Sequence, residues 1–274
     1  GGVLDVAGAA SFDTGGAALM LNAETGHVFG GPVTLETGEA TIASAGALTL
    51  QGAAASRDVT AADMEASGAL VIGGGAGALA LRSLAGQDLA LGGAGGGFDV
   101  SQGALDLISA GSTRVEAAAG RSVRVRGGTS LAGLGDVTLK ADEGVTFEAG
   151  GAEFAGALDI ESGGMVVGDA SALTTGGATT SEAAGDVTLS APNACGGPVS
   201  VSAAGRSVTL GSAADIVLGD VSAMSLSVEA PGGIDAQGVL TLTGDATLTA
   251  FDGLDDGQAS TGLFGDVTAT AAGN

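Results

Sequence analysis

The chain has 274 residues, of which 53 are glycine and 45% are hydrophobic, a composition too apolar for a disordered protein. Acidic residues number 31 against 8 lysines and arginines, so the net charge is −23; this charge repels phosphate backbones and anionic lipids, and we expect no nucleic-acid binding and no membrane insertion. The longest uncharged apolar run, residues 69–81, is broken by glycines and is shorter than the ~20 residues of a spanning helix.

The sequence starts within repeat-like residues and shows neither a basic segment nor an apolar leader at Gly1. No shift in composition divides it. We therefore expect residues 1–274 to form a single repeat domain that is a segment of a longer protein.

One short phrase recurs along the chain: a glycine, one or two small or polar residues, and then alternating apolar residues. It occurs at residues 46–50, 68–72, 103–107, 135–139, 185–189 and 205–210. In the fourth copy, the period of two places Val137 and Leu139 on one face of a strand and Asp136 and Thr138 on the other. A repeat this short cannot bury its own apolar face, so copies of it must stack into a solenoid.

Strand signals follow one another too closely for any helical crossover. They are centred, in chain order, near Leu48, Val59, Leu70, Leu79, Leu89, Phe98, Leu105, Val115 and Val123, about 7 to 11 residues apart. The Asp-Gly pairs that favour tight hairpins occur only at residues 252–253 and 256–257, so a parallel arrangement is favoured over an antiparallel meander.

These spacings predict an all-β fold: a right-handed parallel β-helix, or β-solenoid, with coils of about 20 residues and no long helix. About thirteen coils, stacked at ~4.8 Å per coil, would form a rod of about 60 to 65 Å. Pro32 and Pro198 are expected at the starts of strands, where a missing N–H is tolerated. The narrow interior is expected to hold Val187 and to accommodate Phe147 and Phe154 at bulges.

Residues 185–191, 203–210 and 214–220 resemble the repeats of filamentous-haemagglutinin-like exoproteins, the large β-helical adhesins that Gram-negative bacteria export by two-partner secretion. The resemblance extends from about Leu48 to Ala269. It implies an extracellular or bacterial cell-surface location, a role in the shaft of an adhesin, and an outer-membrane transporter as partner. The family's secretion domain and its Asn-Pro-Asn-Gly motifs are not found in the sequence; Pro192-Asn193 is the nearest match.

Half of the basic residues lie in one short stretch. They are Arg114, Arg121, Arg124 and Arg126. Arg124 and Arg126 share an outward parity, so the group is a candidate ligand-contact patch for a sulfated or carboxylated glycan. The alternative is that these arginines neutralise Glu116, Asp136 and Glu143 in neighbouring coils.

Two acidic or glycine-rich segments suggest calcium but lack its ligand pattern. Residues 92–100 follow the nonapeptide of calcium-binding β-rolls until the sixth position, where glycine replaces the ligand aspartate. Asp252, Asp255 and Asp256 do not have the spacing of an EF-hand. We expect no metal site and no cofactor.

Catalytic residues are not indicated either. His27 is the only histidine and Cys195 the only cysteine, so no disulfide can form within the chain. Tryptophan and tyrosine, the usual platforms for sugar rings, are absent from the sequence. We therefore expect no enzymatic activity, and a polysaccharide-active β-helix enzyme is the first alternative.

The favoured function is a structural or adhesive rod: the shaft of an adhesin or an extracellular matrix filament. No helix suited to cap a terminal coil is evident at either end, so end-to-end stacking with another copy, or continuation into further coils, is expected, and a surface glycan or matrix is a further partner. A second alternative is a surface that orders water or cations, suggested by the threonines at 241–243, 247–249 and 268–270.

Overall fold

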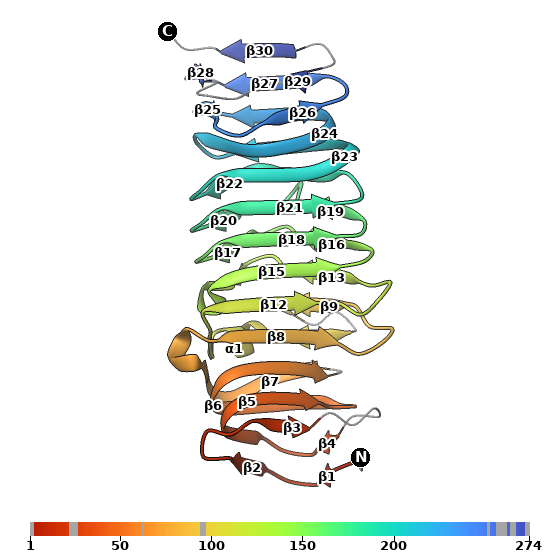
Figure 1. Ribbon diagram of the computed structural model, residues 1–274, viewed down its shortest axis with the longest axis vertical. Coiled ribbons are helices and arrows are strands. Elements are labelled where there is room, and N and C mark those ends of the chain that lie inside the picture. Colours follow the sequence, from red (N-terminus) through yellow and green to blue (C-terminus); the bar gives the residue numbers. More distant parts are fainter. Residues whose placement is uncertain are drawn as a thin grey trace.

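Alternating apolar residues turn inward along nearly every strand, and this alternation winds the chain into a parallel β-solenoid with its termini at opposite ends of the rod (Figure 1). The computed structural model describes residues 3–21, 27–61, 63–93, 97–250, 253–255, 262–263 and 267–271, with backbone alone at 63, 65, 67 and from 253 onward. Strands make up 64% of the structure and helices 4%. The predicted all-β parallel solenoid is confirmed.

The solenoid has about 11 turns of ~21 residues each. The coil length agrees with the prediction, whereas the number of coils is lower than the thirteen expected. Eleven coils at ~4.8 Å correspond to a rod of about 53 Å. The missing coils are explained in part by residues 98–105, which add a strand and a helical turn to an existing coil without completing a new turn.

Every coil crosses three stacked sheets, here named faces 1, 2 and 3. Face 1 contains β3 (Leu19–Leu21), β8 (Ala78–Ser83), β12 (Ser112–Glu116), β15 (Asp136–Ala141), β18 (Leu158–Ser162), β21 (Thr179–Ala183), β26 (Leu240–Leu242) and β29 (Gly262–Leu263). Face 2 contains β9 (Leu89–Leu91), β10 (Phe98–Val100), β13 (Ser122–Val125), β16 (Gly144–Phe147), β19 (Met165–Val167), β27 (Ala246–Ala250) and β30 (Val267–Ala271). Face 3 contains β2 (Ala10–Asp13), β11 (Ile108–Ser109), β14 (Thr129–Ser130), β17 (Ala152–Phe154), β20 (Leu173–Thr175), β25 (Gly233–Ala236) and β28 (Gly253–Asp255).

Six long strands run around corners and so belong to more than one face. They are β5 (Val33–Ala43), β6 (Ala47–Ala61), β7 (Asp63–Ile72), β22 (Val187–Cys195), β23 (Val199–Ser212) and β24 (Ile216–Ala230). At the N-terminal end, β1 (Asp5–Val6) pairs with β4 (Val28–Phe29) as a separate two-stranded sheet. Every strand pair is parallel, because equivalent strands of successive coils run in the same direction.

The core is a set of apolar columns that run along the rod. On face 1, Leu81, Val115, Leu139 and Ile160 are direct neighbours in successive coils and all are fully buried. Each such side chain contributes about 1.5–3 kcal/mol of hydrophobic stabilisation. The columns therefore add hydrophobic stabilisation to the backbone ladder between successive coils.

Phenylalanines and prolines test the finer predictions. Phe147 and Phe154 do not occupy bulges: the pairing of β16 and β17 is regular, and the two buried rings meet edge to face with centroids 6.3 Å apart. The bulge prediction was wrong because the corner between these strands has room for both rings.

Pro32 and Pro198 directly precede β5 and β23, as predicted.

Residues 92–111 break the regular order. β10 lies between β7 and β9 in the sheet, although it follows β9 in the chain. The short helix α1 (Gln102–Leu105) comes next, and β11 then pairs with β7. The strand predicted at Leu105 was therefore wrong: the Ser101 hydroxyl accepts the Ala104 N–H at 3.2 Å and starts a helical turn instead. Two 3₁₀ turns, η1 (Gly73–Gly75) and η2 (Ala132–Leu134), complete the elements.

Many acidic side chains tie one coil to another. Their carboxylates accept backbone N–H groups of other coils at 2.7–3.1 Å, in the pairs Asp88–Ser122, Asp136–Ala157, Asp142–Gly120, Asp186–Ser207, Asp215–Gly233 and Asp220–Val239. Each bond satisfies an N–H where the regular ladder is interrupted: at a turn, beside a strand end or, for Ser207, at a register shift within β23. Part of the high acidic content is thus structural.

One buried amide joins three coils. Asn193 on β22 is 5% exposed. Its Oδ1 accepts the Leu173 N–H at 2.8 Å, and its Nδ2 donates to the carbonyls of Leu189 at 2.8 Å and Gly211 at 3.0 Å. The side chain therefore satisfies backbone groups of the preceding coil, its own coil and the following coil.

Candidate functional site

Charged side chains of alternating sign form a ladder on face 1, where successive strands place them side by side. We name this the charge ladder; its members are Asp58, Arg82, Arg114, Glu116, Lys140 and Glu161. They come from β6, β8, β12, β15 and β18 and point outward between buried neighbours. Three carboxylates face three cations, so the ladder is neutral within a strongly acidic chain.

Glu116 is the centre of the ladder. Its carboxylate receives Lys140 Nζ at 2.9 Å, Arg82 Nε at 3.2 Å and Arg114 Nε at 3.6 Å. Arg114 also forms a two-pronged pair with Glu161, with N–O distances of 3.0 and 2.9 Å, and Arg82 pairs with Asp58. A network of this kind stabilises more than isolated surface pairs do.

Three carboxyl groups of face 1 have shifted pKa values: those of Glu116 and Glu161 are lowered, and that of Asp159 is raised. Lys140, foremost, and Arg82 hold the pKa of Glu116 below its usual value, against the effect of burial; Arg114 does the same for the pKa of Glu161. These two groups therefore stabilise the fold above the pKa of free glutamate, and this stabilisation is lost as the pH falls through their lowered pKa values. Burial, then Glu161 and Glu182, raise the pKa of Asp159, so its ionised form opposes folding at neutral pH.

A Glu116→Gln variant is expected to lose about 1 kcal/mol of unfolding free energy at low salt, because three cations lose their shared partner. The loss should shrink in high salt and at a pH low enough to protonate Glu116 in the wild type. Urea denaturation at several pH values measures both effects. Glu182→Gln is the matched control, because Glu182 lies next to Glu161 on face 1 and forms no ion pair within the described residues; equal losses in the two variants would contradict the role of the ladder.

The four arginines of the predicted patch are divided between two faces. Arg114 lies on face 1 in the charge ladder, whereas Arg124 is on β13 of face 2 and Arg121 and Arg126 flank that strand. The structure thus brings three of them together and separates the fourth. As a contact surface for a ligand, the patch stays a prediction.

Acidic neighbours pair with most of these arginines. Arg126 Nη1 contacts the Glu148 carboxylate at 2.6 and 2.8 Å, and Arg124 Nη2 lies 3.8 Å from Asp88. Of the three carboxylates expected to neutralise the arginines, only Glu116 does so, whereas Asp136 accepts a backbone N–H. Sequence reasoning missed Asp88, Glu148 and Glu161, since their positions beside the arginines depend on the exact length of each coil.

Arg121 differs from the others in having no ion pair within the described residues. Arg124 has only the long contact to Asp88, and its side chain is 45% exposed. Within the predicted patch, these two guanidiniums therefore have little or no internal pairing.

Further along face 1, hydroxyl side chains lie beside the carboxylates of Glu182 and Asp220. A shallow hollow of about 500 Å³ is lined by Thr180, Glu182, Ser200, Ser202, Asp220, Ser222, Val239, Thr241 and their neighbours.

The threonines proposed to order water stack only in part. On face 2, Thr247 and Thr249 pair with Thr268 and Thr270 of the following coil, but the preceding coil has Ser227 and Glu229 at these positions. The threonine column is therefore two coils deep.

The isolated polar residues have structural contacts. His27 is 5% exposed, and its Nδ1 accepts the Leu4 N–H at 2.9 Å. Cys195 lies 3.8 Å from the Thr179 hydroxyl. Neither lies near a second group suited to catalysis among the contacts of the described residues.

The candidate calcium segments fall partly on positions without a description. Asp252, Asp256 and residues 94–96 lie outside the described residues, as does the side chain of Asp255. Elsewhere in the described chain, no group of three or more His, Cys, Asp or Glu side chains is arranged to hold a metal ion.

No described helix has the length and apolar composition needed to cross a membrane.

A family model described as repeats of unknown function (DUF5649) matches residues 1–36, 134–202 and 205–274, well over half of the sequence. The chain belongs to this family. No curated protein and no solved structure matches it. The DUF5649 match agrees with a solenoid built from repeated coils.

The main gap in the DUF5649 match, residues 37–133, has a distinct character. It contains the displaced strand β10, the helix α1 and six of the eight basic residues. With eight acidic residues, its net charge is −2, whereas the remainder of the chain has 23 acidic and two basic residues. The rod therefore has a nearly neutral middle section between strongly acidic DUF5649 repeats.

Proposed function

We propose that the chain is a non-enzymatic rod segment of a secreted or cell-surface bacterial protein, such as the shaft of an adhesin or an extracellular filament. The observation that supports this most is the parallel pairing of every coil with the next along the described rod. In such a stack, backbone hydrogen bonds, buried columns and carboxylate ties hold each coil to its neighbours, as the shaft of a fibre requires. The sequence resemblance to filamentous-haemagglutinin-like repeats points the same way and adds an outer-membrane transporter as partner.

The open N-terminal coil supports assembly along the rod axis. Among the described residues, strands β1, β2 and β3 are paired on one side only, and Leu4, Phe12 and Leu19 beside them are half-buried. A further coil placed there would pair the free backbone groups and cover the apolar side chains. The net charge of −23 opposes side-by-side packing of rods instead.

Electron microscopy and light scattering of the purified chain test this assembly. We expect particles that lengthen along one axis as the concentration rises, with no increase in width. Added salt should allow lateral contacts by screening the charge. A chain that stays a monomer at high concentration would contradict end-to-end assembly.

The adhesive contact is proposed for Arg121 and Arg124 on face 2, where a sulfated or carboxylated glycan would meet guanidiniums with little or no internal pairing. Binding to a panel of such glycans should weaken about tenfold in Arg121→Gln, the loss of one charge-assisted hydrogen bond. Arg206→Gln is the control: it removes an equal charge far along the rod, where Arg206 donates to the Ala184 carbonyl. Equal weakening in both variants would reject this contact.

Cleavage of a glycan by the purified chain would overturn the non-enzymatic part of the proposal, provided that it disappears on replacement of a single aspartate. Antibody labelling of intact producing cells, with and without external protease, tests the location. Labelling only after cell lysis would contradict a surface role.

A further inference from the structure

An arginine is buried inside the solenoid. The alternation of β6 turns Arg57 inward together with Val59 and Ala61, and Arg57 is 2% exposed. Its neighbours in the adjacent coils are the buried side chains Ala40 and Leu79. Every other basic residue of the chain is at least partly exposed.

The guanidinium of Arg57 has no partner within the part of the chain that the structure describes. None of its three nitrogens forms a hydrogen bond, and none is close enough to a described carboxylate for an ion pair. Burial lowers the pKa of Arg57 to about 10, with Glu36 opposing the shift, so the group is charged at neutral pH. A buried charge without a counter-charge is strongly unfavourable, and a fixed set of N–H donors needs acceptors.

A second unsatisfied donor lies at the same corner. β5 and β6 both turn from face 3 to face 1 here, and Thr37 of β5 pairs with Ala54, three residues before Arg57. Thr37 is turned inward, and its Oγ1 is buried without a hydrogen-bond partner. Two donors of different elements are thus left unpaired inside one corner.

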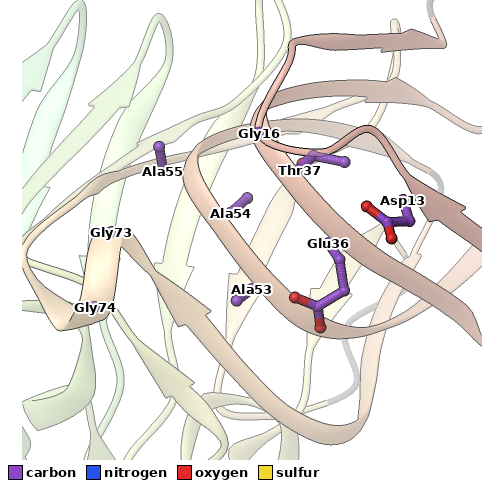
Figure 2. A pocket seen from close by; sticks show the side chains of 9 residues that line it. All are labelled: Asp13, Gly16, Glu36, Thr37, Ala53, Ala54, Ala55, Gly73 and Gly74. Atoms are coloured by element: carbon purple, nitrogen blue, oxygen red, sulfur yellow. The ribbon is translucent and has the colours of Figure 1, made fainter.

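A groove opens over this corner. It has a volume of about 390 Å³, and Figure 2 shows Asp13, Glu36 and Thr37 on one side with Ala54 and Gly73 across from them. Alanine and glycine make its far wall, and the buried Thr37 connects its lining to the interior corner. The carboxylates of Asp13 and Glu36 at its rim repel anions, and they repel multiply charged anions most strongly.

We propose that the interior corner beside Arg57 and Thr37 binds a small monovalent anion of halide size, which enters through this groove. The anion supplies the counter-charge that Arg57 lacks and accepts the hydrogen bond of the Thr37 hydroxyl. The acidic rim and the net charge of the chain make the binding weak, so occupancy depends on the salt in which the rod is placed.

Thermal unfolding in sodium bromide and in sodium gluconate at equal ionic strength tests the site, because gluconate is too large to enter. Bromide should raise the Tm of the wild type by about 2–4 °C over gluconate, the shift expected for about 1 kcal/mol of linked binding in a chain of this size. Arg57→Met should show no difference between the two salts, whereas the exposed control Arg206→Met should respond like the wild type. An equal bromide effect in Arg57→Met would overturn the proposal.

Glu36 provides a readout that does not depend on the folding of Arg57→Met. If Glu36 turned inward to serve as the counter-charge itself, Glu36→Gln would lower the Tm and remove any bromide effect, and the proposal would be rejected. An anion site predicts an equal or larger bromide effect in Glu36→Gln, because the rim loses a negative charge. Anomalous scattering from a crystal grown in bromide should then place a peak beside the Arg57 guanidinium; its absence there would also reject the site.

Discussion

A Val187→Asp variant is expected to lose more than about 4 kcal/mol of unfolding free energy, because the new carboxylate would be buried with no counter-charge. Val187 is 0% exposed. It stacks between Val166 and Val208 of the neighbouring coils, so water cannot reach the position without opening two coils. Urea denaturation followed by circular dichroism measures the loss.

Thr188→Asp is the matched control for this variant. Thr188 follows Val187 on β22 but faces outward and is partly exposed. We expect it to change the stability by less than about 1 kcal/mol. Similar losses for the two substitutions would show that the inward and outward parity of β22 is not the one described.

Asn193→Asp is expected to cost about 3 kcal/mol or more, although the two side chains have nearly the same shape. The carboxylate keeps the bond from the Leu173 N–H but cannot donate to the carbonyls of Leu189 and Gly211. It would instead bring a negative charge against two carbonyl oxygens in a buried corner. Three coils are affected by this single change.

Ser190→Asp on the same strand provides the comparison for Asn193→Asp, since Ser190 is exposed. Hydrogen exchange of the Leu173 and Gly211 regions distinguishes local from global effects. Faster exchange limited to these coils, together with a lower midpoint in urea, is the expected result. An Asn193→Asp variant as stable as Ser190→Asp would contradict the bonding described for the amide.

The fold was predictable because its main signal is local. Alternation in phrases such as 135–139 fixes which side chains point inward, and glycines mark where the chain turns, so coil length follows from their spacing. Leu105 shows the limit of this signal. Its phrase has the same pattern as the others, yet the Ser101 cap and the displacement of β10 place it in a helical turn.

The candidate site was less predictable because it depends on contacts between coils. Arg114 and Arg126 pair with carboxylates that are 47 and 22 residues away in the sequence. These pairings depend on the register between coils, and a change of one residue in a single turn would alter that register. The inward position of Arg57 was visible in the alternation with Val59 and Ala61, but its isolation from any carboxylate required the three-dimensional structure.

The position of β10 has a consequence for the order in which the rod is made. A solenoid in which each coil rests on the one before it can be completed step by step as the chain leaves the ribosome. Here β9 emerges before β10, the strand on which it rests. A nascent chain that ends at residue 93 therefore has β9 beside an empty row of the sheet, and only the return of residues 98–100 fills that row. We therefore expect the coils on either side of β10 to fold only after residues 98–100 have been synthesised, whereas coils of the described rod that are stacked in chain order can fold as they emerge.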